Sequence, residues 1–182
     1  MTAVTALPLR GGPFTRADLE SMPDDGRRYE LIDGCLLVTP APRWMHQRGV
    51  AELFVILRAA TPDYAETLPG PFAIVPEDDT ELQPDVFVAR RADFTEKELP
   101  AAPLLVVEVL SPSTRSFDLG AKRERYERAG TPAYWVFDPA AVRLRAWELR
   151  DGAYVLVGDV SGDEAFETNV PFPVRVVPST LV

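Results

Sequence analysis

Glu108 interrupts an otherwise apolar segment, LLVVEVL, at positions 104–110. A nearly continuous run of aliphatic and β-branched residues is typical of a central strand that is buried on both faces. Side chains alternate along a strand, so Glu108 shares a face with Val106 and Leu110. Because an unpaired buried charge is costly, the Glu108 carboxylate must meet a cation, a metal ion or a proton donor.

Asp85 is a second acid in an unusual place. It follows Pro84 at the start of an expected strand and lies on the face of Phe87 and Ala89. A single acid at this position is commonly a cap or turn residue. On neighbouring strands, however, Asp85 and Glu108 would face the same side, and close carboxylates repel each other but bind Mg²⁺ or Mn²⁺ well. We therefore predict that Asp85 and Glu108 are ligands of a divalent metal ion.

Lys122 completes the predicted group. On an expected helix over 118–129, it shares the stripe of Leu119 and Tyr126, which should face the sheet. The ordinary alternative is a lysine at the edge of the stripe that extends its ammonium group into solvent. Two carboxylates and an inward lysine suit metal-assisted phosphodiester cleavage, in which the ammonium stabilises the charged phosphate or positions water. We predict that Asp85, Glu108 and Lys122 converge in one pocket.

The elements that must position these residues follow from hydrophobic periodicity and turn signals. We expect a short helix from Thr15 to about Met22, and a hairpin around Asp33-Gly34. The remaining expected elements are helices over 43–60 and 118–129, and strands over 72–75, 85–89, 104–110, 133–137, 142–149 and 154–157. The 182 residues suit one domain, predicted over 14–182 after a flexible arm over 1–13. This order predicts an α/β (α+β) domain with one mixed sheet.

Charge and cysteine content limit the classes of protein that fit. The chain has 28 acidic and 19 basic residues, a net charge of −9, which disfavours tight non-specific DNA binding. Residues 115–128 carry five bases against three acids and could form a local basic face. One cysteine, Cys35, excludes an intramolecular disulfide and fits a reducing, cytoplasmic location. No apolar run approaches the roughly 20 residues of a membrane span, and no signal peptide is evident.

Four segments together resemble a known family. They are YELIDG (29–34), PDVFV (84–88), VVEVLSPSTRSFDLGAKRERYERAG (106–130) and AYWVFDP (133–139). They resemble the Uma family of restriction-endonuclease-like proteins, within the PD-(D/E)XK nuclease superfamily, over about residues 14–150. The resemblance implies a restriction-endonuclease-like fold, with a mixed central β-sheet flanked by helices.

The resemblance also implies roles for individual residues. Pro84-Asp85 matches the "PD" element, and Glu108 matches the second acid. Leu110 stands where the superfamily lysine would ordinarily be, which implies that the lysine has moved to the next helix, as Lys122. Glu30 resembles an additional acid near the metal. His46, which could otherwise be a capping or surface residue, matches a histidine near the site.

Three functional hypotheses follow. The first is an Mg²⁺- or Mn²⁺-dependent endonuclease that hydrolyses DNA. The second is a catalytically inactive nucleic-acid-binding or assembly module that keeps the fold. The third is a buried Glu108–Lys122 ion pair in a scaffold, which leaves Asp85 unexplained. A homodimer is expected, because two-fold symmetry suits action on both strands of a duplex, with the 28–39 hairpin and the arm as contacts.

Other side chains suggest chemistry less strongly. Ser111 and Ser113 could be nucleophiles, but no base is spaced to activate them, so we expect a loop and N-cap role. Aromatic side chains in the last helix and the following strand could stack on bases, but we expect them in the core. These aromatic residues are Tyr126, Tyr134 and Trp135.

Overall fold

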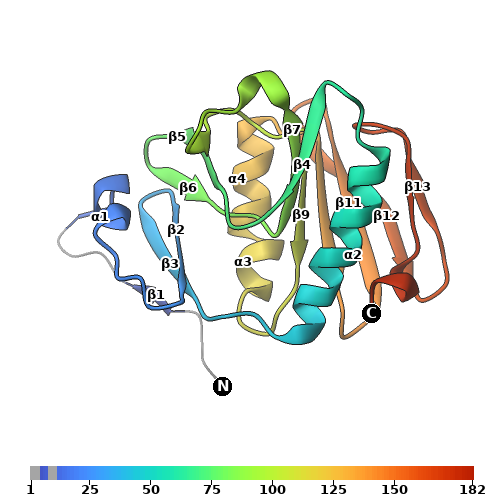
Figure 1. The fold of residues 1–182 in the computed structure, drawn as a ribbon, viewed down its shortest axis with the longest axis horizontal. Coiled ribbons are helices and arrows are strands. Elements are labelled where there is room, and N and C mark those ends of the chain that lie inside the picture. The colour runs from blue at the N-terminus through green and yellow to red at the C-terminus, as the bar shows by residue number, and fades with distance from the viewer. Residues whose placement is uncertain (1–4, 8–11) are drawn as a thin grey trace.

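The structure, a computed structural model, describes residues 5–7 and 12–182. These residues form a mixed α+β fold whose strands lie in two six-stranded sheets and one two-stranded sheet, rather than in the single sheet expected from the sequence (Figure 1). Of the predicted arm, residues 1–4 and 8–11 lie outside the described residues. Residues 5–7 form strand β1, which pairs with β3.

The first sheet contains the predicted N-terminal hairpin. Its strand order is β1-β3-β2-β6-β5-β8. Its strands are β1 (Thr5–Leu7), β2 (Arg28–Ile32), β3 (Cys35–Thr39), β5 (Ala73–Glu77), β6 (Thr80–Leu82) and β8 (Glu98–Leu99). Between β2 and β3, Asp33 has φ 49° and Gly34 has φ 74°, the positive values that a type I′ turn requires. The predicted hairpin is confirmed.

The second sheet carries the long apolar strands. Its order is β12-β11-β10-β9-β7-β4, and β9 and β10 are parallel while their other neighbours are antiparallel. Its strands are β4 (Ala65–Pro69), β7 (Val86–Arg90), β9 (Leu105–Val109), β10 (Ala133–Asp138), β11 (Arg143–Arg150) and β12 (Ala153–Ser161). A separate pair, β13 (Phe166–Thr168) and β14 (Val174–Val176), packs near β12. Six strands were not expected from the sequence: β1, β4, β6, β8, β13 and β14.

Helices cover both faces of the second sheet. Helix α2 (Trp44–Ala60) packs Leu53 and Leu57 on one face, in a cluster with Val107. Helices α3 (Arg115–Leu119) and α4 (Ala121–Ala129) lie between the two sheets in Figure 1, and Tyr126 packs with Val106 on the second face. Both faces of β9 are therefore buried, as predicted.

The remaining short elements lie at the periphery. Helix α1 (Arg16–Glu20) forms where a short helix was expected, and the side chain of its N-cap residue, Thr15, forms a capping box with Asp18. Two 3₁₀ helices, η1 (Arg91–Asp93) and η2 (Pro178–Leu181), follow β7 and β14. Within the described part of the chain, no helix is long and apolar enough to span a membrane.

The expected helix over 118–129 is two helices. The backbone breaks at Gly120, which has φ −117° and ψ −102°. A Cβ atom there would lie 2.9 Å from the carbonyl oxygen of Ser116, so glycine permits this close approach. Periodicity did not reveal the break, because the spacing of side chains across it is that of a continuous helix. Asp118 and Lys122 even form an i, i+4 ion pair across the break.

The aromatic residues near this helix belong to the core. Tyr126, Tyr134 and Trp135 are fully buried. The expectation that they pack in the interior, rather than stack on bases at the surface, is confirmed.

Candidate active site

Strands β7 and β9 bring Asp85 and Glu108 to the same place. Val86 pairs with Val107 in antiparallel register, and one further step along this register sets Asp85 opposite Glu108. Opposite residues of antiparallel strands have Cα atoms about 4.5–5.5 Å apart and side chains on one face. The Val109 N–H donates to Asp85 Oδ2 at 2.9 Å, which fixes the Asp85 carboxylate beside β9.

A close backbone approach also positions Asp85. The Gly70 N–H donates to the Asp85 carbonyl oxygen at 2.9 Å. A Cβ atom at position 70 would lie only 2.4 Å from the carbonyl oxygen of Pro84. Only glycine therefore permits the segment after β4 to lie against the Pro84-Asp85 segment.

Lys122 lies at the centre of a group of carboxylates. Its Nζ atom is 3.0 Å from Glu30 Oε1 and 3.2 Å from Glu108 Oε1, and 3.6 Å from Asp118 Oδ1. Lys122 is only 1% exposed, so it does not extend to solvent at the edge of the helix. Glu30 reaches Lys122 from β2 of the first sheet, and its Oε1 also accepts the Gln83 N–H at 2.9 Å. The group therefore forms where both sheets meet α4.

Arg28 and His46 hold the Asp85 carboxylate. Two guanidinium N–H groups of Arg28 donate to Asp85 Oδ1, each at 3.2 Å. The Nε2 atom of His46, in the first turn of α2, is 3.1 Å from Asp85 Oδ2. His46 thus lies at the predicted site and contacts Asp85 directly.

Sequence reasoning missed Arg28 and the role of Asp118. Arg28 stands two residues before Glu30 on β2, so strand alternation places both side chains on one face. Asp118 stands four residues before Lys122, which is the spacing of contacting side chains on a helix. Both signals were in the sequence, but each residue was assigned only to the end of an element.

The electrostatic environment shifts the pKa values of the two predicted metal ligands, Asp85 and Glu108, in opposite directions. Burial acts to raise the pKa of Asp85, but the His46 hydrogen bond and the charges of Arg28, His46 and Lys122 outweigh it, so this pKa lies well below its usual range. Burial raises the pKa of Glu108 well above its usual range, against the attraction of Lys122. Burial also acts to lower the pKa of Lys122, but its carboxylate neighbours outweigh that effect and raise it.

The site contains more carboxyl groups than cations. Four buried carboxyl groups face two permanent cations, Lys122 and Arg28. Without His46, the formal charge of these six groups is −2 when every carboxyl group has lost its proton. The four carboxyl groups are Glu30, Asp85, Glu108 and Asp118.

The donor chemistry of this group fits a divalent cation. Glu30 Oε2 and Asp118 Oδ1 are buried without a hydrogen-bond partner among the described residues. Carboxylate oxygens are the ligands that Mg²⁺ and Mn²⁺ prefer, and one divalent ion would balance the excess charge. Among residues 5–7 and 12–182, however, no three His, Cys, Asp or Glu side chains are arranged as a ready-made ion site. The fit therefore lies in donor type and charge, not in preset ligand geometry.

Asp118 makes the stability of the protein depend on pH. Burial raises its pKa from 3.8 to about 6. A raised acid pKa means that the native state binds the proton more tightly, so stability is lost as pH rises from about 4 to 6. This change corresponds to about 3 kcal/mol. Asparagine does not ionise, so we expect Asp118→Asn to show no such loss. The free energy of unfolding of the variant should therefore rise relative to that of the wild type across this pH range.

Urea unfolding at pH 4, 5, 6 and 7 measures the effect. Asp63→Asn, at an exposed position, is the matched control and should follow the wild-type curve. Parallel curves for wild type and Asp118→Asn would contradict the assignment.

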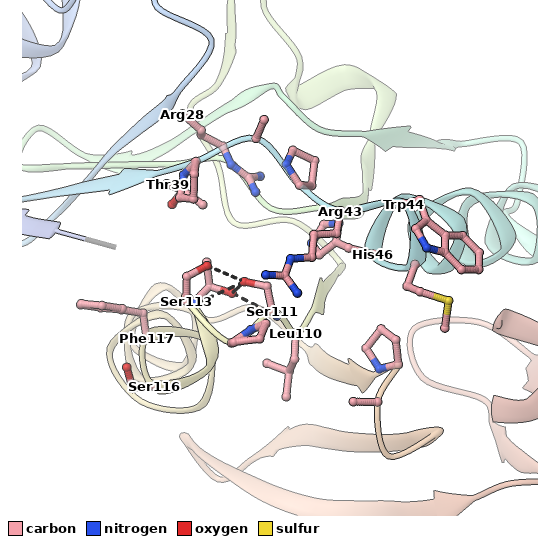
Figure 2. A pocket seen from close by; sticks show the side chains of 18 residues that line it. Arg28, Thr39, Arg43, Trp44, His46, Leu110, Ser111, Ser113, Ser116 and Phe117 are labelled. Atoms are coloured by element: carbon pink, nitrogen blue, oxygen red, sulfur yellow. Dashed lines mark hydrogen bonds between the residues drawn. The ribbon is translucent and has the colours of Figure 1, made fainter. Parts of the chain in front are cut away.

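Two cavities lie beside Arg28 and His46, the residues that hold Asp85. The larger has a volume of about 780 Å³ and lies between the start of α2 and the loop before α3 (Figure 2). The smaller, of about 310 Å³, is lined by Asp85 itself. Both cavities are lined by Arg28 and His46 and by the 40–42 segment, so the two residues that hold Asp85 face both of them.

The serines of the larger cavity belong to a turn. Ser111 Oγ is 2.9 Å from Ser113 Oγ and 3.0 Å from Thr114 Oγ1, as the dashed lines in Figure 2 show. His46, which could have activated a serine, contacts Asp85 instead. This geometry agrees with the expected loop role for the serines, but the N-cap residue of α3 is Thr114 and not a serine.

The basic segment over 115–128 does not form a free basic face. Arg115 pairs with Asp138, and Arg128 pairs with Asp33. Arg125 is buried against Glu77. Arginines that line the cavities near Asp85 come instead from the hairpin and the start of α2: Arg27, Arg28 and Arg43.

Comparison with known proteins agrees with this architecture. The structure is similar to the crystal structure of a protein from Anabaena variabilis ATCC 29413 that is described as "a putative nuclease belonging to DUF820", with a TM-score of 0.74 and 17% sequence identity. The match covers 93% of this chain and 97% of that chain, and it establishes a shared restriction-endonuclease-like fold. No curated protein sequence matches this chain. Residues 16–177 match the model of the Uma2 family, described as "Putative restriction endonuclease". The chain therefore belongs to the Uma2 family.

Proposed function

We propose that the protein is an Mg²⁺- or Mn²⁺-dependent endonuclease that hydrolyses phosphodiester bonds in DNA. The observation that carries the proposal is the burial of Lys122 among Glu30, Glu108 and Asp118, next to Asp85. A scaffold needs only one carboxylate to pair with one lysine. An excess of buried carboxyl groups beside arginine-lined cavities suits a site for a cation and a phosphate.

Asp85 and Glu108 would hold the ion. When bound, it would polarise the scissile phosphate and lower the pKa of the attacking water. Arg28 and His46 keep Asp85 ionised and fixed in orientation. A carboxylate held in this way is ready to bind a cation without first losing a proton.

Lys122 would act on the phosphate. Its raised pKa keeps the ammonium group charged, and this charge can stabilise negative charge that develops on phosphate oxygens. Glu30 and Asp118 hold the ammonium group in place from two elements, β2 and α3. Glu30 is thus the accessory acid of the proposed site.

A second candidate is an inactive nucleic-acid-binding or assembly module. It is favoured by the hydrogen bonds of Asp85, because both oxygens of this carboxylate already have partners within the protein. In this form the carboxylates serve as partners of Lys122 and Arg28 and bind no metal. The predicted homodimer is compatible with either candidate and remains a prediction.

Metal dependence separates the two candidates. We expect cleavage of DNA with Mn²⁺ or Mg²⁺ and none with EDTA. Mn²⁺ at about 100 times its Kd should add about 2.7 kcal/mol to stability, which raises the Tm of a domain this size by about 5–10 °C. Gel electrophoresis of plasmid and oligonucleotide substrates measures cleavage, and thermal melts measure binding. An unchanged Tm with no cleavage would favour the inactive module.

A further inference from the structure

The larger cavity has a lining that suits part of a nucleic acid. Its volume of about 780 Å³ lies within the range of small-ligand sites, roughly 300–1,000 Å³. None of the described residues that line it is acidic, although the chain carries a net charge of −9. Apolar side chains form a large part of the lining, among them Pro40, Pro42, Leu110, Pro112, Phe117 and Pro139.

Arg43 and Trp44, which line this cavity, are residue types that do not favour folding at their positions. Arg43 occupies the N-cap of α2 but makes no capping hydrogen bond, and arginine is neither a good N-cap nor favourable at the positive end of a helix dipole. Trp44 follows in the first turn and is 71% exposed. Figure 2 shows Arg43 extended toward Ser111 in the cavity, with Trp44 on the adjacent helix turn. Within the described part of the chain Arg43 makes no capping hydrogen bond, and most of the Trp44 side chain is exposed, so a ligand is a better explanation of their presence than the fold.

We propose that this cavity binds one unpaired base of the DNA substrate, with Trp44 stacked on a base and Arg43 paired with a neighbouring phosphate. The inference rests on the proposed nuclease function and names its substrate class. Apolar walls and an exposed indole recognise the face of a base, and every base offers such a face. In a continuous duplex these faces are covered by stacking, so the site favours single strands, flaps or frayed ends.

Fluorescence anisotropy in EDTA tests binding without cleavage. The probes are a fluorescein-labelled oligothymidylate of about 12 nucleotides, within the usual site size, and a blunt hairpin duplex of matched length. We expect the single strand to bind at least tenfold more tightly. Trp44→Ala should lower the affinity for the single strand by about tenfold, which is the effect of losing one stacked base. Trp44→Phe should retain most of the affinity.

Matched variants control for charge and for aromatic surface. Arg43→Ala should lower the affinity for the single strand. It should also reduce the salt dependence of that affinity by the amount expected for about one phosphate contact. Arg48→Ala, on an exposed part of α2 outside both cavities, and Tyr64→Ala, which is 51% exposed elsewhere, should change nothing. Trp135 and Trp147 are buried, so quenching of tryptophan fluorescence by the oligonucleotide reports on Trp44.

The outcomes distinguish this inference from the proposed function. Equal affinity for duplex and single strand, with no effect of Trp44→Ala, overturns the base site. If the protein cleaves DNA with Mn²⁺ but Trp44→Ala changes neither the binding nor the cleavage of the single strand, the nuclease stands and the base site fails. If binding to the single strand depends on Trp44 but Mn²⁺ gives no cleavage, the base site stands and the nuclease fails.

Discussion

Glu108→Gln is expected to reduce metal-dependent DNA cleavage by about 10³-fold, at the upper end of the effect of removing one stabilising group from a reaction centre. Glutamine keeps the shape of the side chain but removes the negative charge, so the ion loses a ligand and the scissile phosphate loses its Lewis acid. The fold should be retained, since burial already raises the pKa of Glu108 and disfavours its charged form. Cleavage rates and thermal melts of the same preparations test both parts.

The melts give this prediction its control. Mn²⁺ should raise the Tm of the wild type and have little effect on Glu108→Gln. Glu124→Gln, on an exposed part of α4, changes the same charge outside the site and should behave as wild type. Equal cleavage rates for Glu108→Gln and wild type would exclude Glu108 from the catalytic machinery.

The convergence of Asp85, Glu108 and Lys122 could be predicted because each residue interrupts a regular pattern. Glu108 and Asp85 stand on apolar strands, and Lys122 stands on an apolar helix stripe. Strand alternation and helix periodicity are local properties, so the sequence alone indicates which side each residue faces. The resemblance added Glu30 and His46, whose positions depend on contacts between distant elements.

The division into two sheets could not be predicted in the same way. The hairpin β2–β3 joins β6 through a single paired position, Leu31 with Glu81, and β6 has only three residues. Its segment reads as an acidic turn, yet Thr80 and Leu82 are fully buried. Such short, long-range pairings leave little trace in local composition, because tertiary contacts decide them.

The same limit applies to Arg28. Its alternation with Glu30 on β2 is visible in the sequence, but its partner is Asp85, 57 residues away. Before the two sheets are placed together, an arginine at the start of a hairpin strand is indistinguishable from a solvent-exposed one. Arg28 and Glu30 thus have partners outside the first sheet, whereas Asp118 contacts Lys122 locally.

Lys122→Met is expected to destabilise the protein in the absence of metal by about 3–5 kcal/mol at neutral pH, the usual cost of breaking a buried ion pair. Methionine keeps most of the volume but leaves Glu30, Glu108 and Asp118 without their shared cation. Lys97→Met, at the other lysine of the chain and exposed, is the matched control. Urea unfolding of both variants measures the loss.

The double variant Glu108→Gln/Lys122→Met shows whether the two residues act as a pair. Removing the carboxylate together with the ammonium group should recover part of the lost stability, because fewer charges remain unpaired. If the stability loss of the double variant equals the sum of the losses of the two single variants, Lys122 is held chiefly by Glu30 and Asp118.

Mn²⁺ decides what the carboxylates around Lys122 are for. If they form a metal site, a divalent ion can replace the lost ammonium charge, so Mn²⁺ should raise the Tm of Lys122→Met at least as much as that of wild type. Cleavage should still be slow, because the phosphate has lost its ammonium partner. If the group is only a structural ion-pair network, Mn²⁺ has no site in either protein. If Mn²⁺ raises neither the Tm of the wild type nor that of Lys122→Met, the nuclease hypothesis is wrong.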